Sequence, residues 1–378
     1  MGAGHPLYGI AVRKPLWPAA LARPVGCAIM ACKMEHATIK HSVLSCIGRG
    51  SAPGKVILFG EHAVVYGRPA LAVPVTQVRA EATVEPGLEG AGPVIYAEDL
   101  REEVIVADAP ADHPLAAAVR MALAQLGLAE PPSWKVTVHS TIPVASGLGS
   151  GAAVSAAIVC ALADAAGRAL APPEVSALVF EVEKLHHGTP SGVDNTVIAY
   201  GYPVYFARRG GRPPEPAHTV FFPVRIGRPF QLAIANSGIA SPTRVAVEDV
   251  RRAWQREPAR FEGLFDGISR VVEAARIAIS EGEPERLGPL MDENHALLSE
   301  VGVSCPELDG LARAARRAGA AGAKLSGAGR GGNLIALVTE QTTGPVTAAL
   351  RAAGAVDVII TTVGEKTPPA TAIDPVRR

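Results

Sequence analysis

The sequence predicts an α+β fold, because strand-like and helix-like patterns occupy different parts of the chain. Strand patterns dominate residues 54 to 107, helical patterns fill much of 241 to 318, and strand patterns return near residues 333 and 356. A run of strands followed by a run of helices is typical of α+β proteins. The chain has 378 residues, 48% of them hydrophobic, so it can bury a large core divided between two domains.

Three parts are expected along the chain. Residues 1–48 carry scattered prolines and no steady period, so we expect an N-terminal extension that is disordered or reflects a misplaced start codon. Residues 49–227 are predicted to form an N-terminal domain and residues 228–378 a C-terminal domain. The boundary is placed near Gly227, before the apolar run at 230–235.

Composition excludes several classes of partner. The formal net charge is zero, so nothing indicates nucleic acid or an anionic membrane surface. No uninterrupted apolar run reaches the roughly 18 residues of a membrane span. Five cysteines at irregular spacing make a poor disulfide framework, which favours a reducing cytoplasm. A small-molecule substrate is expected, and a homodimer is left open.

The first predicted element is a buried strand at residues 56–59, flanked by polar side chains. Lys55 stands at its start, and Glu61 and His62 follow its end. A single lysine is usually a solvated charge, but this arrangement favours the lining of a site. His62 suits a hydrogen bond to substrate better than a metal. A Walker A loop is excluded, since Val56 stands where serine or threonine is required.

The most informative stretch is STIPVASGLGSGAAVSAAIVC, residues 140–160. A strand-like run meets a glycine-serine loop that opens directly into an alanine-rich helix. Glycines at 147, 149 and 151 let the backbone approach an anion, and the helix N-terminus supplies unpaired N–H groups. The alternative is a plain turn between a strand and a buried helix. An anionic substrate is the first hypothesis.

A dinucleotide site is the other interpretation of this loop, since Gly147, Gly149 and Ala152 fit the loose G-x-G-x-x-A pattern. That pattern requires a second strand ending in an acidic residue. The segment that follows has a helical period instead, carried by Val175, Leu178, Val179, Val182 and Leu185. A nucleoside triphosphate therefore fits better than NAD.

Two acidic residues follow, each with two interpretations. Ser191 to Asp194 spells Ser-x-x-Asp, which from spacing alone favours a helix-capping box. The alternative places Asp194 at the phosphate loop beside Lys55, as a base or an electrostatic orienter. Glu183, near the end of the preceding helix, is either a solvated charge or an oxygen ligand for Mg²⁺.

A further glycine pattern occurs at Gly327, Gly329 and Gly332. Asn333 and the strand-like segment LIALV follow it, so the context of a dinucleotide site is absent. The loop is either a hairpin connection or a segment long enough to close over a ligand.

Taken in order, APGKVILFGEHAVVYG, PVASGLGSGAAVS, HGTPSGVDN and KLSGAGRGG resemble the motifs of the mevalonate kinase family within the GHMP kinase superfamily. The resemblance spans roughly residues 50 to 362. It implies a two-domain α+β fold, with an N-terminal domain like the second domain of ribosomal protein S5 and a ferredoxin-like C-terminal domain.

The implied activity is ATP-dependent phosphorylation of the C5 hydroxyl of mevalonate, with Mg²⁺, in isoprenoid precursor synthesis. Alternatives are a sister kinase for phosphomevalonate or homoserine, and a non-catalytic sensor on the same fold.

By the same resemblance, Lys55 and Asp194 are the catalytic residues, and both also contact the substrate. Glu61, His62 and Thr243 match substrate-binding positions. Glu183 and Ser150 are the expected metal ligands. The residues implied in nucleotide binding are Pro143, Ser146, Gly147, Leu148, Gly149, Ser150, Gly151, Ala152, Gly327 and Gly329.

Two positions depart from the family pattern. Gly151 stands where the family often has a serine assigned to magnesium, so Ser150, Ser155 or water must serve. Arg330 stands where glycine is common, so its side chain either reaches the nucleotide phosphates or points into solvent.

Overall fold

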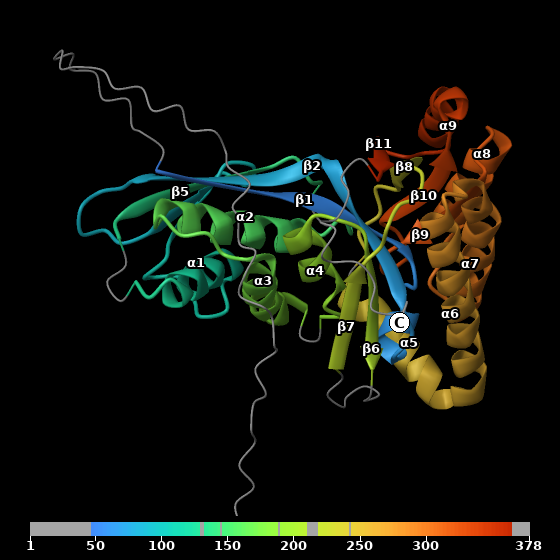
Figure 1. Ribbon diagram of the computed structural model, residues 1–378, viewed down its shortest axis with the longest axis horizontal. Helices are drawn as coiled ribbons and strands as arrows, with labels where there is room; N and C mark the ends of the chain where they lie inside the picture. The colour runs from blue at the N-terminus through green and yellow to red at the C-terminus, as the bar shows by residue number, and fades with distance from the viewer. Residues whose placement is uncertain are drawn as a thin grey trace, which may run out of the picture. The chain divides into compact units, whose positions relative to one another are not determined.

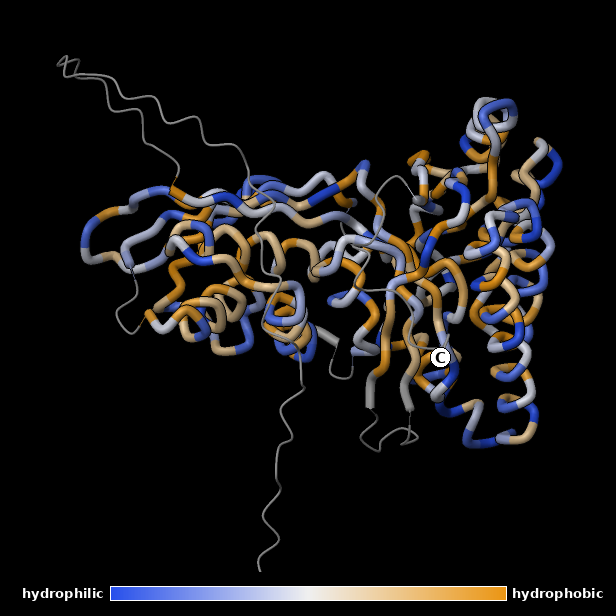
Figure 2. Tube along the Cα trace, viewed as in Figure 1, coloured by the Kyte–Doolittle hydropathy of each residue, from blue (hydrophilic) through white to orange (hydrophobic). Residues whose placement is uncertain are grey.

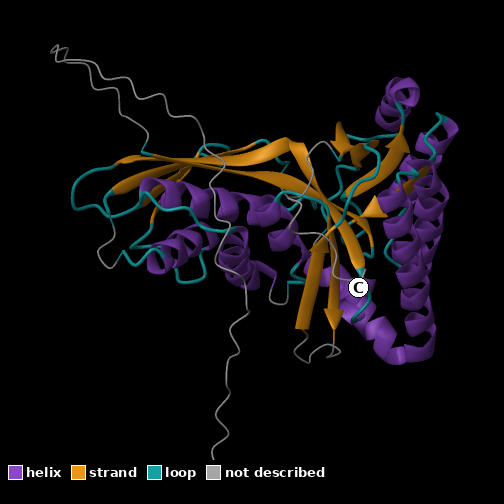
Figure 3. Cartoon of the chain, in the orientation of Figure 1, coloured by secondary structure: helices purple, strands orange, loops and turns teal. Residues whose placement is uncertain are grey.

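Two β-sheets, each covered by helices, organise the part of the chain described by the computed structural model (Figures 1 and 3). The described residues are 47–128, 132–143, 146–187, 190–209, 218–241 and 243–364. The predicted N-terminal extension lies outside them, except for its last two residues.

The first sheet has seven strands among the described residues, in the order β4-β3-β5-β2-β6-β7, with β1 paired to β2. All of its pairings are antiparallel except that of β3 with β5. Its strands are β1 (Gly48–Phe59), β2 (Ala70–Pro86), β3 (Val94–Ala97), β4 (Glu102–Ile105), β5 (Trp134–Ser140), β6 (Val204–Arg209) and β7 (His218–Pro223).

Helices cover this sheet on the side of α2, which contacts both β1 and β2 (Figure 1). The connections also contain the short 3₁₀ turn η1 (Ala63–Tyr66) directly after β1. The helices are α1 (Pro114–Gln125), α2 (Ser150–Ala165), α3 (Pro172–His187) and α4 (Val193–Tyr200).

Helix α2 approaches β1 unusually closely, because two strand residues have no side chain. A Cβ atom on Gly50 would lie 2.0 Å from the carbonyl oxygen of Ala157. One on Gly48 would lie 2.4 Å from the carbonyl oxygen of Ala161. Any larger residue would push the helix off the strand. The predicted alanine-rich helix is thus seated directly on the first residues of β1, which lie before the strand predicted at 56–59.

The second sheet is antiparallel throughout, in the order β11-β8-β10-β9. Its chain order, strand, helices, two strands, helix, strand, is that of a ferredoxin-like domain and confirms the expectation. Its strands are β8 (Phe230–Asn236), β9 (Gly322–Ser326), β10 (Asn333–Val338) and β11 (Asp357–Val363). Its helices are α5 (Thr243–Arg256), α6 (Pro258–Glu281), α7 (Leu287–Val301), α8 (Pro306–Arg317) and α9 (Glu340–Ala352), with a 3₁₀ turn η2 (Pro284–Arg286).

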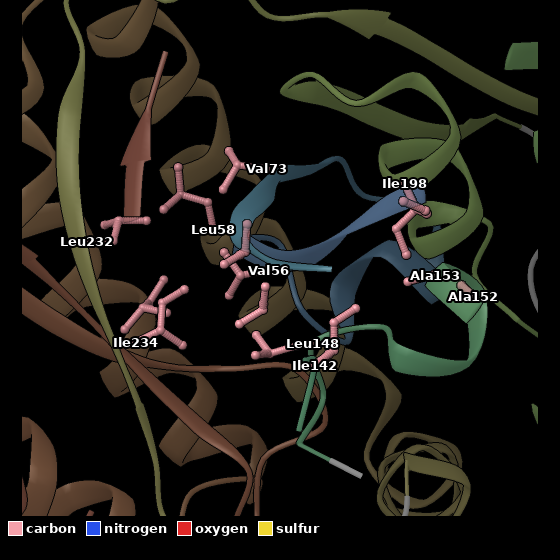
Figure 4. Packing of buried hydrophobic residues seen from close by; sticks show 14 of the residues in the cluster. Val56, Leu58, Val73, Ile142, Leu148, Ala152, Ala153, Ile198, Leu232 and Ile234 are labelled. Atoms are coloured by element: carbon pink, nitrogen blue, oxygen red, sulfur yellow. The ribbon is translucent and has the colours of Figure 1, made fainter. Parts of the chain in front are cut away.

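One hydrophobic core runs from one sheet into the other. Figure 4 shows Leu232 and Ile234 of β8 beside Leu58 of β1 and Leu148 of the loop before α2. The helices of the two sheets differ in hydropathy. Helix α2 is mostly hydrophobic, whereas α6 and α7 alternate between hydrophobic and hydrophilic residues (Figure 2). Leu148 therefore anchors the loop before α2 in a core that both sheets share.

The sheets change between Pro223 and Phe230, the interval that contains Gly227. The predicted domain boundary at Gly227 stays a prediction. In α3 the expected stripe holds for Val175, Val179 and Val182, which are buried, whereas Leu185 is 42% exposed. In the part of the chain that is described, every helix is too short or too polar to cross a membrane. The cytoplasmic location stays a prediction, and a homodimer stays an open question.

Candidate active site

The predicted phosphate loop leads into the N-terminus of α2. Gly149 caps the helix in the left-handed conformation, with φ of 74°, and Ser150 is the first helical residue. The backbone N–H of Lys55 donates to the carbonyl oxygen of Leu148 at 2.9 Å, which ties the loop to β1. Ser146 Oγ donates to the carbonyl oxygen of Pro143 at 2.7 Å. The first-turn N–H groups of α2 therefore face outward beside β1, as an anion site requires.

Lys55 and Asp194 form an ion pair next to this loop. The Nζ atom of Lys55 lies 3.0 Å from Oδ1 of Asp194, and the two side chains are 5% and 30% exposed. A Cβ on Gly149 would lie 3.0 Å from Cγ of Lys55, so the lysine stem runs along the helix cap. The ammonium is therefore enclosed, while the carboxylate stays open to a ligand.

Glu183 of α3 completes a cluster of three charged groups. It is 4% exposed, and burial raises its pKa to about 7, with a further increase from the charge of Asp194 and an opposing effect of Lys55. Its Oε1 lies 3.4 Å from where a Cβ on Gly151 would stand, so it reaches the first turn of α2. The structure thus brings the three predicted charged side chains together at the helix N-terminus.

This donor set fits a hard divalent cation. A buried carboxylate whose pKa is raised by burial and by a second carboxylate gains when a cation approaches. Mg²⁺ needs only one or two protein oxygens, since phosphates and water complete its shell. No group of three or more histidine, cysteine or acidic side chains forms a separate metal cage in the described residues.

The capping interpretation of Asp194 is wrong. Helix α4 is capped by Gly192, which has φ of 90°, and no side chain makes a capping hydrogen bond there. Ser191 Oγ accepts from the N–H of Val193 at 3.3 Å, a turn contact. Because the left-handed glycine starts the helix one residue later than the capping box requires, the Asp194 carboxylate is left for Lys55.

His62 follows β1 with its backbone in the left-handed region, at φ of 59°. Its Nε2 lies 3.0 Å from the carbonyl oxygen of Ala328 in the third glycine loop. Burial lowers the pKa of His62 to about 4; the hydrogen bond to Ala328 raises it, and the charge of Arg330 lowers it. The ring is therefore neutral near pH 7, and because a carbonyl oxygen only accepts, Nε2 must carry the proton. Nδ1 is left as a hydrogen-bond acceptor.

Glu61 is buried in a different environment. Its side chain and that of Lys324 on β9 form an ion pair that is 0% exposed on both sides. Asn294 Nδ2 donates to the second oxygen of Glu61 at 3.4 Å, and Lys324 Nζ also donates to the carbonyl oxygen of Leu325 at 2.6 Å. Glu61 thus joins the turn after β1 to the second sheet, and its contact with substrate stays a prediction.

The third glycine loop connects β9 to β10 and is held at both ends. A Cβ on Gly329 would lie 2.0 Å from the carbonyl oxygen of Val303, so only glycine fits there. Gly327, with φ of 92°, has open space around it. Asn333 is 1% exposed and donates to the carbonyl oxygen of Ser146, which joins this loop to the phosphate loop.

Two predicted residues lie outside this cluster of contacts. Arg330 pairs with Asp249 on α5, so its side chain is held by the protein. Thr243 is the exposed first residue of α5, and its closeness to substrate stays a prediction. Sequence reasoning missed Lys324, Asn294 and Asn333. Each acts on a partner far away in the chain, and nothing in the local pattern indicates it.

Comparison with known proteins identifies the class to which the chain belongs. The model for the GHMP kinases N terminal domain matches residues 114–202, and that for the GHMP kinases C terminal domain matches residues 275–356. These are the two halves of one class of small-molecule kinase.

The chain is 35% identical over 331 residues to the mevalonate kinase of Thermococcus sibiricus, covering 82% of this chain and 94% of that protein. It is 37% identical over 328 residues to the mevalonate kinase of Thermococcus gammatolerans, covering 80% and 93%. A solved structure of L. major mevalonate kinase in complex with R-mevalonate superposes with a TM-score of 0.73 at 31% identity, over 85% of this chain and 97% of that one. The chain belongs to the mevalonate kinase family.

Proposed function

We propose that this chain transfers the γ-phosphoryl group of ATP to the C5 hydroxyl of mevalonate, giving 5-phosphomevalonate and ADP. The observation that carries the proposal is the Lys55–Asp194 ion pair of 3.0 Å at the N-terminus of α2. Anion binding alone needs no carboxylate beside the ammonium. A phosphoryl transfer to an alcohol needs both groups. The ammonium interacts with the phosphate, and the carboxylate interacts with the hydroxyl.

The triphosphate is assigned to the loop before α2 and to the first turn of that helix. Backbone N–H groups there bind phosphate oxygens, helped by the positive end of the helix dipole. Glu183 and the Ser150 hydroxyl would hold Mg²⁺, with water in place of the serine absent at position 151. The bound cation would neutralise charge on the phosphate oxygens.

Lys55 and Asp194 act on the reacting atoms. The Lys55 ammonium stabilises the negative charge that develops on the transferred group. The Asp194 carboxylate, the more exposed partner, receives the hydrogen bond of the C5 hydroxyl and orients its oxygen toward phosphorus. As the new O–P bond forms and the bond to the ADP oxygen breaks, the hydroxyl proton passes to Asp194.

His62 contributes to recognition in this proposal. Its Nδ1 accepts a hydrogen bond from a substrate hydroxyl, because Nε2 is engaged with Ala328. Its burial keeps the ring neutral, so it adds no positive charge that would compete with Lys55 for the phosphate.

The decisive experiment measures ADP release with ATP, Mg²⁺ and one acceptor at a time: mevalonate, phosphomevalonate, homoserine or galactose. Release with mevalonate alone is expected, and Asp194→Asn should abolish most of it. Faster release with phosphomevalonate or homoserine would assign a sister kinase. ATP binding without release for any acceptor would point to a sensor.

A further inference from the structure

Two carbonyl groups of the phosphate loop, on either side of Gly147, are held from outside the loop. The backbone N–H of Lys55 on β1 donates to the carbonyl oxygen of Leu148 at 2.9 Å. The side-chain amide of Asn333, the first residue of β10, donates to the carbonyl oxygen of Ser146. One anchor is therefore a strand backbone, and the other is a single side chain.

These anchors set the direction of the N–H groups that follow them. The C=O and N–H of a trans peptide unit point in opposite directions, so fixing the carbonyls of Ser146 and Leu148 fixes the N–H groups of Gly147 and Gly149. Within the described residues, neither of these N–H groups donates to a protein acceptor. Ser146 and Leu148 are 3% and 1% exposed, whereas Gly147 is exposed. Both N–H groups are therefore available to phosphate oxygens.

Asn333 acts from a well-held position in the second sheet. Its strand pairs with β8 on one side and with β9 on the other. The preceding residue, Gly332, donates its N–H to the carbonyl oxygen of Ile239 at 2.9 Å, and its own carbonyl oxygen accepts from the N–H of Ser237 at 2.9 Å. A Cβ on Gly332 would lie 3.7 Å from the carbonyl oxygen of Ser146, so the start of β10 lies close to that oxygen.

The amide of Asn333 uses only half of its hydrogen-bonding capacity. The residue is 1% exposed, and its Oδ1 has no hydrogen-bond partner in the part of the chain that is described. Because a carbonyl oxygen only accepts, the NH₂ group must face Ser146. A buried acceptor without a partner costs stability, and a leucine of similar volume would avoid that cost. The hydrogen bond to Ser146 therefore accounts for an amide at this position.

We propose that Asn333 is a positioning residue for nucleotide binding, which directs the Gly147 N–H toward a phosphate oxygen by holding the Ser146 carbonyl. Asn333 acts through the loop. This inference deepens the proposed function and rests on it for the choice of nucleotide. Loss of the amide donor weakens binding of the nucleotide phosphates and leaves the recognition of mevalonate unchanged.

The test is calorimetric titration of the full chain with ADP and Mg²⁺. Asn333→Leu removes the donor at nearly constant volume. We expect the Kd for ADP to rise by about tenfold, the loss of one well-placed hydrogen bond. In steady-state kinetics the KM for ATP should rise similarly, while the KM for mevalonate stays the same. An unchanged Kd for ADP in Asn333→Leu would overturn the proposal.

A second variant, Asn333→Asp, keeps the shape of the side chain and tests the donor itself. Near neutral pH the introduced carboxylate only accepts, so ADP should bind more weakly than to Asn333→Leu. Burial raises the pKa of such a carboxyl group, and once protonated it can donate to Ser146.

At low pH the affinity of Asn333→Asp for ADP should therefore exceed that of Asn333→Leu at the same pH. Relief of charge repulsion alone would bring the two variants level, and that result would overturn the role of the donor. If Asn333→Leu does not fold, Asn333→Asp is compared with the unmodified chain. Its ADP affinity should then approach that of the unmodified chain as the pH falls, and a constant ratio of the two affinities would overturn the proposal.

The matched control is Ile335→Val, two residues further along β10. Ile335 is 0% exposed and lies outside the site, so its shortening lowers stability without touching the phosphate loop. Thermal unfolding measures the loss of stability in each variant. We expect ADP affinity to stay unchanged in Ile335→Val. An equal loss of ADP affinity in Ile335→Val and Asn333→Leu would show that β10 acts only through stability, and would overturn the positioning role.

The titration needs neither mevalonate nor turnover, so it separates this inference from the proposed function. A chain that binds ADP with the expected dependence on Asn333, but releases no ADP from ATP with mevalonate, overturns the proposed function and supports the positioning role. Normal turnover with unchanged ADP affinity in both Asn333 variants does the reverse. Absence of ADP binding to the unmodified chain would overturn both.

Discussion

Two lysine–carboxylate pairs stand at opposite ends of the same segment of β1 and its following turn, and they differ in exposure. Lys55 and Asp194 are 5% and 30% exposed, whereas Lys324 and Glu61 are 0% exposed on both sides. The first pair leaves one partner open to a ligand. The second is sealed between the sheets. Residue type and pairing alone therefore do not separate a reacting pair from a structural one, but the exposure of the carboxylate does.

The largest expected effect is on turnover at the open pair. Asp194→Asn removes the proton acceptor but keeps an oxygen that can orient the hydroxyl, and Lys55→Met removes the charge. We expect kcat to fall by about 10²- to 10⁴-fold in each. Steady-state kinetics of ADP release, with thermal unfolding as a check on folding, measure this.

The matched control is the exposed pair of Glu181 and Lys184 on α3, whose atoms approach to 2.6 Å. Lys184→Met should leave kcat and stability nearly unchanged, since exposed pairs contribute little. Near-normal turnover in Asp194→Asn would make that residue an orienter and remove its role as base.

The next effect is on stability at the sealed pair. Lys324→Met leaves the Glu61 carboxylate buried without its cation, which should lower the free energy of unfolding by about 3–5 kcal/mol. The double variant Glu61→Gln/Lys324→Met removes both charges and should regain much of that loss. Urea denaturation measures both. A loss below about 1 kcal/mol in Lys324→Met would end the distinction between the two pairs.

A smaller effect concerns Glu183 beside the open pair. Its pKa is raised from 4.5 to about 7, so between these values the folded state binds more protons than the unfolded state. The contribution of Glu183 to the free energy of unfolding is therefore present at low pH and lost as the pH rises through 7. The free energy of unfolding falls by about 3 kcal/mol over this range.

Glu183→Gln should remove that loss. Without ligands, its melting temperature should exceed that of the unmodified chain at pH 8, and the difference should shrink as the pH falls and vanish below about pH 4.5. The pKa of His62 is lowered to about 4, so its contribution is lost as pH falls below 6.5 and is present in both proteins. The difference in melting temperature between the two proteins at each pH therefore reports Glu183 alone. Equal melting temperatures at pH 8 would refute the assigned burial of Glu183.

The smallest effect tests how the open pair is placed. Gly149→Ala and Gly327→Ala both put a Cβ on a left-handed residue, which should cost about 1–2 kcal/mol in each. Only Gly149 has the stem of Lys55 at 3.0 Å, whereas Gly327 has open space. We therefore expect kcat to fall further in Gly149→Ala. Equal kinetics in the two variants would show that the cap does not position the lysine.

Local patterns predicted much of the fold. The apolar run of β1, the glycine-to-helix junction of α2 and the helical period of α3 are set by neighbouring residues, and all three elements are present. The helical period wrongly predicted that Leu185 is buried. This residue lies in the last turn of α3 and is 42% exposed. The two-sheet arrangement came from the resemblance, because strand order is not encoded in periodicity.

The site was predicted less completely. The charges of three residues, Lys55, Glu183 and Asp194, have a clear use at a phosphate loop. Their chemistry therefore predicted that they lie close together. Lys324 and Glu61 are 263 positions apart, and a lysine inside a strand gives no sign of burial. Asn333 meets Ser146 across 187 positions. Such contacts depend on how the two sheets pack, which no short window of sequence records.

The absence of side chains at Gly48 and Gly50, which seats α2 against β1, has a consequence for recognition of the triphosphate. A helix packed this closely against a strand has little room to tilt, so we expect its positive end to keep its direction before any nucleotide arrives. Little reorganisation energy is then spent when phosphate oxygens enter. We therefore expect any movement that admits ATP and releases ADP to involve a segment other than α2.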